Sequence, residues 1–171
     1  YPSWLYPVKK GATTIWERWD GIKPDSSFQT PSMNSYNHYA YGAIGDWMYR
    51  VLVGLNTDES RPGYKHSIIK PFPGRGFTHA KASIDTYYGK LSNSWQSDGN
   101  GFSMEVVIPA NTTATVYLPA ADLSAVQEGG MPINLAGGIK TVPADSGYTG
   151  LSLGSGSYRF TVVKPAGASL K

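Results

Sequence analysis

The stretch GFSMEVVIPANTTATVYL, residues 101–118, decides the fold class of this chain. Apolar side chains recur at every second position in two runs of this stretch: Phe102, Met104, Val106, Ile108, then Ala114, Val116 and Leu118. A period of two is typical of a β-strand that buries one face and exposes the other. The stretch therefore predicts two half-buried strands.

The same period continues on both sides of these strands, at Ala80, Ala82 and Ile84 upstream and at Tyr158, Phe160 and Val162 downstream. Between two runs, Asp98-Gly99-Asn100-Gly101 predicts a hairpin turn. Prolines stand at the ends of runs, where a missing N–H costs least: Pro109, Pro119 and Pro143. Short strands separated by turns predict an antiparallel β-sandwich over residues 57–171.

A different period precedes the sandwich. Between residues 32 and 56, apolar side chains recur at three- and four-residue spacing: Tyr36, Ala40, Ala43, Ile44, Trp47, Val51 and Leu55. This pattern predicts one helix over residues 34–55 that buries Trp47, Val51 and Leu55, with Gly54 and Asn56 as its end signals. Small and aromatic residues on its other side (His38, Gly42, Gly45 and Tyr49) indicate a second contact face, as in a larger helical assembly. We therefore expect two domains, residues 1–56 and 57–171.

Composition narrows the possible classes of protein. The 171 residues are 40% hydrophobic and 16% charged, which is typical of a folded globular protein. The net charge of +3 comes from scattered basic residues, so we expect no nucleic-acid partner. No apolar run approaches the ~20 residues that span a bilayer, and cysteine is absent. The sequence predicts no metal site and no cofactor, and it leaves the cellular compartment open.

The densest cluster of chemically useful side chains is TTIWERWDG, residues 13–21. Indole rings beside a carboxylate suit a sugar site, because the rings stack on a pyranose while the carboxylate binds a hydroxyl group or a water. The alternative is that Glu17 pairs with Arg18 or a lysine at the surface while the tryptophans fill a core. Residue types alone favour this structural alternative, and they also favour a structural role for His38.

The same residues carry a resemblance to a known family. Ser3-Trp4, the block Gly11–Trp19 and the block Asn37–Arg50 resemble the end of the catalytic domain of bacterial α-L-rhamnosidases. The blocks Gly63–Pro71 and Asn111–Pro119 resemble the C-terminal β-domain of that family. The resemblance covers most of residues 1–120. It implies a mainly β chain in which a β-sandwich follows the last helix or helices of an incomplete α/α barrel.

The resemblance also implies roles for individual residues. In this family a barrel enzyme hydrolyses terminal α-L-rhamnose with inversion, which matches Glu17 to the general base and His38 to a sugar contact. Trp16 and Trp19, which flank the carboxylate, are the further candidates for substrate binding. The general acid of the family lies upstream of the matching segment, so we expect this chain alone to be inactive.

Two other functions stay open at this stage. The chain could be a free-standing carbohydrate-binding sandwich with residues 1–56 as a linker, or the sandwich could be purely structural. For residues 57–171 alone the structural role is favoured, because their aromatic residues form no continuous run. The expected partners are a rhamnose-containing glycoside or polysaccharide and the remainder of the catalytic domain. We also expect self-association through an exposed aromatic patch: Trp16, Trp19, Tyr39 and Tyr41.

Overall fold

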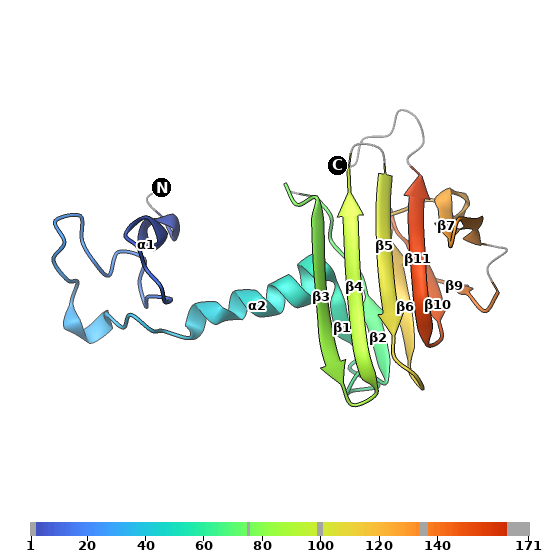
Figure 1. Ribbon diagram of the computed structural model, residues 1–171, viewed down its shortest axis with the longest axis horizontal. Helices are drawn as coiled ribbons and strands as arrows, with labels where there is room; N and C mark the ends of the chain where they lie inside the picture. Colours follow the sequence, from blue (N-terminus) through green and yellow to red (C-terminus); the bar gives the residue numbers. More distant parts are fainter. Residues whose placement is uncertain (1–2, 75, 99–100, 134–136, 164–171) are drawn as a thin grey trace. The chain divides into compact units, whose positions relative to one another are not determined.

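The structure is a computed structural model in which the chain forms two compact units, residues 1–46 and residues 47–171 (Figure 1). Each unit is described by itself. The residues that the structure describes are 3–74, 76–98, 101–133 and 137–163.

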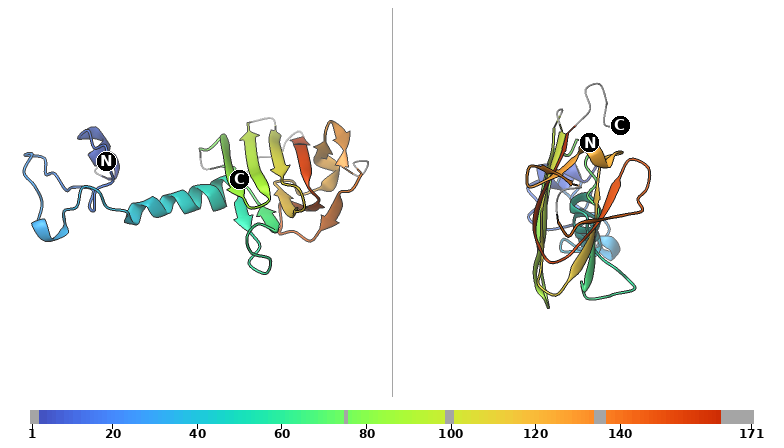
Figure 2. Two further views of the ribbon diagram at one scale, coloured as in Figure 1. Left: turned by 60° about the horizontal axis from the view of Figure 1, so that its bottom comes forward. Right: turned by 90° about the vertical axis from the view of Figure 1, so that its right-hand side faces the viewer.

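The second unit is a β-sandwich of two sheets that lie in two layers (Figure 2). One sheet has five strands, in the spatial order β1 (Leu55–Thr57), β2 (His66–Ile69), β6 (Thr113–Leu118), β10 (Thr149–Leu153), β9 (Lys140–Val142). The other has six, in the order β3 (His79–Thr86), β4 (Gly89–Ser97), β5 (Gly101–Ile108), β11 (Gly156–Val163), β7 (Val126–Glu128), β8 (Met131–Pro132). A short 3-10 helix, η4 (Leu123–Ala125), precedes β7. The predicted sandwich is confirmed.

One strand pair departs from the expected antiparallel pattern. β2 and β6 pair in parallel, with His66 opposite Thr113 and Ile69 opposite Val116. The chain leaves the five-stranded sheet after β2, forms β3, β4 and β5 in the other sheet, and returns as β6. A crossover of this length permits parallel pairing, which a hairpin does not.

The core lies between the two sheets and follows the alternation seen in the sequence. The alternating residues of β5 and β6 are each at most 4% exposed: Phe102, Met104, Val106, Ile108, Ala114, Val116 and Leu118. Pro109, Pro119 and Pro143 directly follow β5, β6 and β9, as predicted. The predicted hairpin joins β4 to β5, although its central residues 99–100 lie outside the described part of the chain.

The helix before the sandwich starts later than its sequence pattern indicates. It runs as η2 (Ala40–Ala43), α2 (Ile44–Trp47) and the π-helical η3 (Met48–Val53). The prediction of a helix from residue 34 is wrong. Residues 35 and 38 instead form backbone hydrogen bonds with the segment around Glu17, which a helical backbone could not make.

The buried face of the helix also differs from the prediction. Trp47 and Val51 are each 37% exposed, whereas Leu52 and Val53 are buried together with Leu55. A π-helical turn has its hydrogen bonds at five-residue spacing, so it rotates the following side chains away from an ideal 3.6-residue stripe. The wider turn therefore brings Leu52 and Val53 into the core.

The end of the helix is attached to β4 by two buried side chains. The indole Nε1–H of Trp95 donates to the Leu52 carbonyl at 2.8 Å, and the Asn93 amide donates to the Val53 carbonyl at 2.7 Å. Gly54 follows with φ 83°, a left-handed conformation that ends the helix as predicted. The last carbonyls of a helix have no hydrogen-bond donor within the helix, and here two side chains of β4 supply donors for two of these carbonyls.

The first unit contains little regular structure. Besides η2 and the start of α2, its elements are α1 (Leu5–Lys9) and η1 (Pro31–Met33), with an isolated bridge between Ile22 and Phe28. Tyr6 anchors α1, because its ring is buried and its hydroxyl donates to the Ile22 carbonyl at 2.7 Å.

Candidate functional site

Glu17 and His38 are brought together by a short backbone ladder in the first unit. The Glu17 N–H donates to the Ser35 carbonyl at 2.7 Å, and the His38 N–H donates to the Ile15 carbonyl at 2.8 Å. These bonds align two segments that are about twenty residues apart in the sequence. The ladder therefore places the two candidate residues on the same side of the unit.

The two oxygens of the Glu17 carboxylate have different environments. Oε2 accepts a hydrogen bond from the Ser35 N–H at 2.9 Å, which fixes the orientation of the group. Oε1 lies 3.9 Å from Nε2 of His38, beyond direct hydrogen-bonding distance. The side chains of His38 and Glu17 are 31% and 23% exposed, so solvent reaches both. The site thus offers one anchored and one available carboxylate oxygen.

The position of the His38 proton follows from its other nitrogen. Nδ1 accepts a hydrogen bond from the Ala40 N–H at 3.4 Å, so in the neutral ring the proton resides on Nε2. Nε2–H therefore faces Glu17 as a donor. The imidazole stacks on Tyr39, with ring centroids 5.4 Å apart and planes inclined by 9°.

Tyr36 holds the segment between Ser35 and His38 in place. Its hydroxyl donates to the Gly21 carbonyl at 2.8 Å and accepts from the Asn34 amide at 2.8 Å. Its ring meets Trp16 edge to face at 5.3 Å, and the Thr14 hydroxyl donates to its carbonyl. Substituting Gly21 would disturb this arrangement, because an added Cβ would lie 2.8 Å from the Asn34 side-chain oxygen.

A second carboxylate close in sequence is engaged elsewhere. Asp20 accepts from Arg18 at 2.7 and 3.3 Å and from Gln29 at 2.9 Å. The hydrogen bond from the Arg18 guanidinium lowers the pKa of Asp20, with a further contribution from its charge. Arg18 thus pairs with Asp20, and the alternative in which it pairs with Glu17 is not what the structure shows.

The four aromatic residues expected to form an exposed patch differ in burial. Tyr39 and Tyr41 are 89% and 42% exposed, whereas Trp16 is only 5% exposed. Trp19 is partly buried and packs edge to face on Tyr6 at 5.6 Å. The prediction of one patch containing all four is therefore wrong, since Trp16 belongs to the interior. Its burial leaves little of the indole for contact with a sugar.

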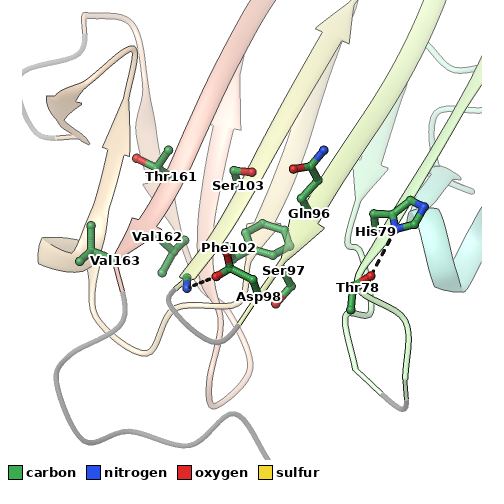
Figure 3. A pocket seen from close by; sticks show the side chains of 11 residues that line it. Thr78, His79, Gln96, Ser97, Asp98, Phe102, Ser103, Thr161, Val162 and Val163 are labelled. Atoms are coloured by element: carbon green, nitrogen blue, oxygen red, sulfur yellow. Dashed lines mark hydrogen bonds between the residues drawn. The ribbon is translucent and has the colours of Figure 1, made fainter.

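A hollow of about 680 Å³ lies at one end of the six-stranded sheet (Figure 3). Among the described residues that line it, Asp98 is the sole carboxylate, and it accepts from the Gly101 N–H at 3.0 Å. The described lining therefore lacks the pair of carboxyl groups that glycoside hydrolysis requires.

Within residues 3–74, 76–98, 101–133 and 137–163, no three His, Asp or Glu side chains are grouped so that they could hold a metal ion. Among these residues there is also no helix of the length and apolar character needed to cross a membrane.

Two family profiles match adjacent segments of the chain. Residues 1–52 match the profile of the bacterial α-L-rhamnosidase 6 hairpin glycosidase domain, and residues 54–131 match that of the bacterial α-L-rhamnosidase C-terminal domain. The chain belongs to the bacterial α-L-rhamnosidase family. An α-L-rhamnosidase from Streptomyces avermitilis is 45% identical over 162 residues, which are 95% of this chain and 15% of that protein. One from Formosa agariphila is 45% identical over 119 residues, which are 70% of this chain and 13% of that protein.

Solved α-L-rhamnosidases share the fold of this family member. The Streptomyces avermitilis enzyme, solved in complex with L-rhamnose, superposes with a TM-score of 0.79 at 44% identity, over 95% of this chain and 15% of its own. The enzyme from Dictyoglumus thermophilum superposes with a TM-score of 0.78 at 34% identity, over 96% and 18%. The chain thus spans less than a fifth of each of these relatives.

The sequence suggested Glu17 and His38 as candidate site residues but missed the residues that position them. Ser35 acts through its backbone N–H, which no side-chain pattern reveals. Tyr36 was counted as part of the helical stripe, although its hydroxyl links two loops. Asp20 belongs to the cluster of residues 13–21, and its position two residues after Arg18 could have indicated that the two side chains pair.

Proposed function

We propose that this chain contributes the general base of an inverting α-L-rhamnosidase, with Glu17 as that base. The observation that supports the proposal is the difference between the two oxygens of the Glu17 carboxylate. Oε2 is held by the Ser35 N–H, while Oε1 stays available 3.9 Å from the His38 ring. A base that acts on a water needs this combination of fixed orientation and a free oxygen.

In the proposed reaction, Oε1 of Glu17 takes a proton from a water molecule. The oxygen of that water attacks the anomeric carbon from the face opposite the leaving group, and the glycosidic bond breaks as an acid protonates the leaving oxygen. The Nε2–H of His38 donates to a hydroxyl of the rhamnose. The backbone bond to Ser35 keeps the carboxylate in line with the water throughout.

We expect the second carboxyl group of the reaction to come from outside this chain. Inverting glycosidases hold their two carboxyl groups ~6.5–9.5 Å apart, with room for the water. Asp20 is unsuited to act as the acid, because the Arg18 hydrogen bond keeps its pKa below the usual range. We therefore expect the 171-residue chain alone to show no turnover of an aryl α-L-rhamnoside.

Trp19 is the remaining aromatic candidate for a sugar contact, since it is partly exposed whereas Trp16 is not. The alternative of a free-standing sandwich with residues 1–56 as a linker has less support. Residues 1–52 match a glycosidase domain, and the Glu17–His38 arrangement has an ordered hydrogen-bonded frame that a linker does not need.

The stereochemistry of the product tests this proposal. The enzyme in which this chain is joined to its remaining catalytic domain is mixed with an aryl α-L-rhamnoside, and the anomeric protons are followed by NMR. Inversion predicts that β-L-rhamnose appears first and equilibrates later. Initial release of α-L-rhamnose would contradict the assignment of Glu17 as a base acting on water.

A further inference from the structure

The hairpin turn between β3 and β4 carries two tyrosines, although tyrosine is not a preferred turn residue and these two side chains are not part of the core. β3 ends at Thr86 and β4 begins at Gly89, so Tyr87 and Tyr88 form a two-residue loop. Such positions are usually occupied by Gly, Asn, Asp, Ser or Pro. Tyr87 is 102% exposed, the fully solvated value, and Tyr88 is 39% exposed. Two large aromatic side chains thus face solvent at a position where local structure does not favour them.

The turn that presents these tyrosines is held rigidly. The Thr86 hydroxyl accepts from the Tyr88 N–H at 3.1 Å and donates to the Gly89 carbonyl at 2.7 Å. Gly89 has φ 118°, which relieves the backbone at the point where the chain reverses. A rigid turn lowers the conformational entropy that its backbone loses on binding. The loop is therefore preorganised to offer its aromatic rings to a ligand.

Hydrogen-bonding groups from two other loops lie beside the turn. The Lys65 ammonium is 5.0 Å from the centre of the Tyr88 ring and donates to the Asn111 carbonyl at 2.5 Å. Asn111 lies in the turn between β5 and β6, which shares one end of the sandwich with the β3–β4 turn (Figure 1). We name Lys65, Tyr87, Tyr88 and Asn111 the tyrosine-turn cluster.

Backbone strain coincides with this cluster. Three described non-glycine residues have positive φ, and two of them are Asn111 at 60° and Tyr64, the neighbour of Lys65, at 64°. A bulky aromatic residue in the left-handed region is a genuine outlier, and strained residues gather at binding sites. Tyr64 thus holds a disfavoured conformation directly beside the cluster, whereas Asn111 is a residue type that tolerates the left-handed region.

From this arrangement we propose that the tyrosine-turn cluster is a saccharide-binding site separate from Glu17. The exposed ring of Tyr87 stacks on the C–H face of a sugar, and the side chains of Asn111 and Lys65 bind its hydroxyl groups. Lys90 pairs with Asp85 at 2.9 Å, whereas the Lys65 ammonium keeps its positive charge, since it contacts a carbonyl oxygen and the Tyr88 ring. We assign a neutral sugar chain as the ligand, because the exposed Tyr87 ring offers stacking while the Lys65 ammonium is already held by a carbonyl and a ring. The site would retain this chain near the enzyme during hydrolysis.

Binding to the 171-residue chain tests the proposal without any turnover. Amide NMR spectra are recorded during titration with a neutral oligosaccharide of α-linked L-rhamnose. We expect saturable shifts at residues 86–89 and 110–112. Tyr87→Ala weakens binding by about tenfold or more, whereas Tyr87→Phe keeps the ring and most of the affinity. Tyr49→Ala, which removes an exposed tyrosine from η3, leaves binding unchanged.

Two results would overturn the proposal. One is the absence of saturable shifts at both turns, and the other is equal binding by the wild-type chain and Tyr87→Ala. Stronger binding of an acidic polysaccharide than of the neutral oligosaccharide would contradict the assigned ligand class. Because Tyr87 is fully exposed, its replacement removes no packing, so loss of binding is not a folding defect. None of these results depends on the role of Glu17.

Discussion

A methyl group added at Gly54 should lower the stability of the sandwich through one identifiable close contact. It ends η3 with φ 83°, and its carbonyl accepts from the Lys70 N–H at 2.9 Å. A Cβ at this position would lie 2.3–2.4 Å from the backbone of Lys70 and Pro71. Backbone atoms cannot move aside as a flexible side chain can, so β1 and β2 would have to separate.

The expected loss has two parts. A non-glycine residue in the left-handed conformation costs about 1–2 kcal/mol, and forcing an extra methyl into a closely packed site costs about 1–3 kcal/mol. Gly54→Ala should therefore lower the free energy of unfolding by about 2–5 kcal/mol, a large part of the ~5–15 kcal/mol typical of a domain. Gly63→Ala is the matched control, because Gly63 has φ 75° and no atom within 4 Å of the added Cβ.

Urea unfolding of both variants, followed by far-UV circular dichroism, separates the two parts. The second unit contains all the named strands, so the strand signal reports on it. Gly63→Ala should lose only the conformational part, about 1–2 kcal/mol, and Gly54→Ala about 1–3 kcal/mol more. Equal losses in the two variants would refute the close approach of Gly54 to β2.

Three further predictions concern single side chains of the sandwich. Trp95→Phe leaves the buried Leu52 carbonyl without its donor and should lower the unfolding free energy by about 1–3 kcal/mol in urea unfolding. Burial lowers the pKa of His66 below its unfolded value of about 6.5, so protons bind more readily to the unfolded chain. Stability should therefore fall as the pH drops below about 6.5, and urea midpoints measured for His66→Gln should fall less. Lys70→Met, which removes the 2.6 Å ion pair with the largely exposed Asp145, should cost about 1 kcal/mol or less by the same assay, and a loss above about 2 kcal/mol would contradict the solvent-screened pair.

The strands were predictable because the alternation of apolar and polar residues in the sequence matches the alternation of buried and exposed positions in the sheet. In β5, Phe102 to Ile108 alternate between core and solvent, and the local sequence contains that information completely. The end of the helix was also predictable, because glycine has no Cβ and adopts the left-handed conformation of Gly54 without strain. The parallel pairing of β2 with β6 was not, because it depends on where the chain returns after three intervening strands.

The sequence suggested Glu17 and His38 as candidates but not the hydrogen bonds that position them. Glu17 and His38 stood out through motif resemblance, and the structure places them 3.9 Å apart. The ladder that aligns them consists of backbone bonds between distant segments, which also explains why the helix begins only at Ala40. The burial of Trp16 was hidden for the same reason, because its partner Tyr36 comes from the other segment.

The most direct test of the account is the activity of Glu17→Gln in the enzyme that joins this chain to its remaining catalytic domain. The amide keeps the size of the side chain but cannot accept a proton, so kcat on an aryl α-L-rhamnoside should fall by ~10²–10⁴-fold. The same exchange at the exposed Glu59 should leave kcat unchanged. If Glu17→Gln retained kcat within a few-fold of the wild type, Glu17 would not be the base, and the central claim would fail.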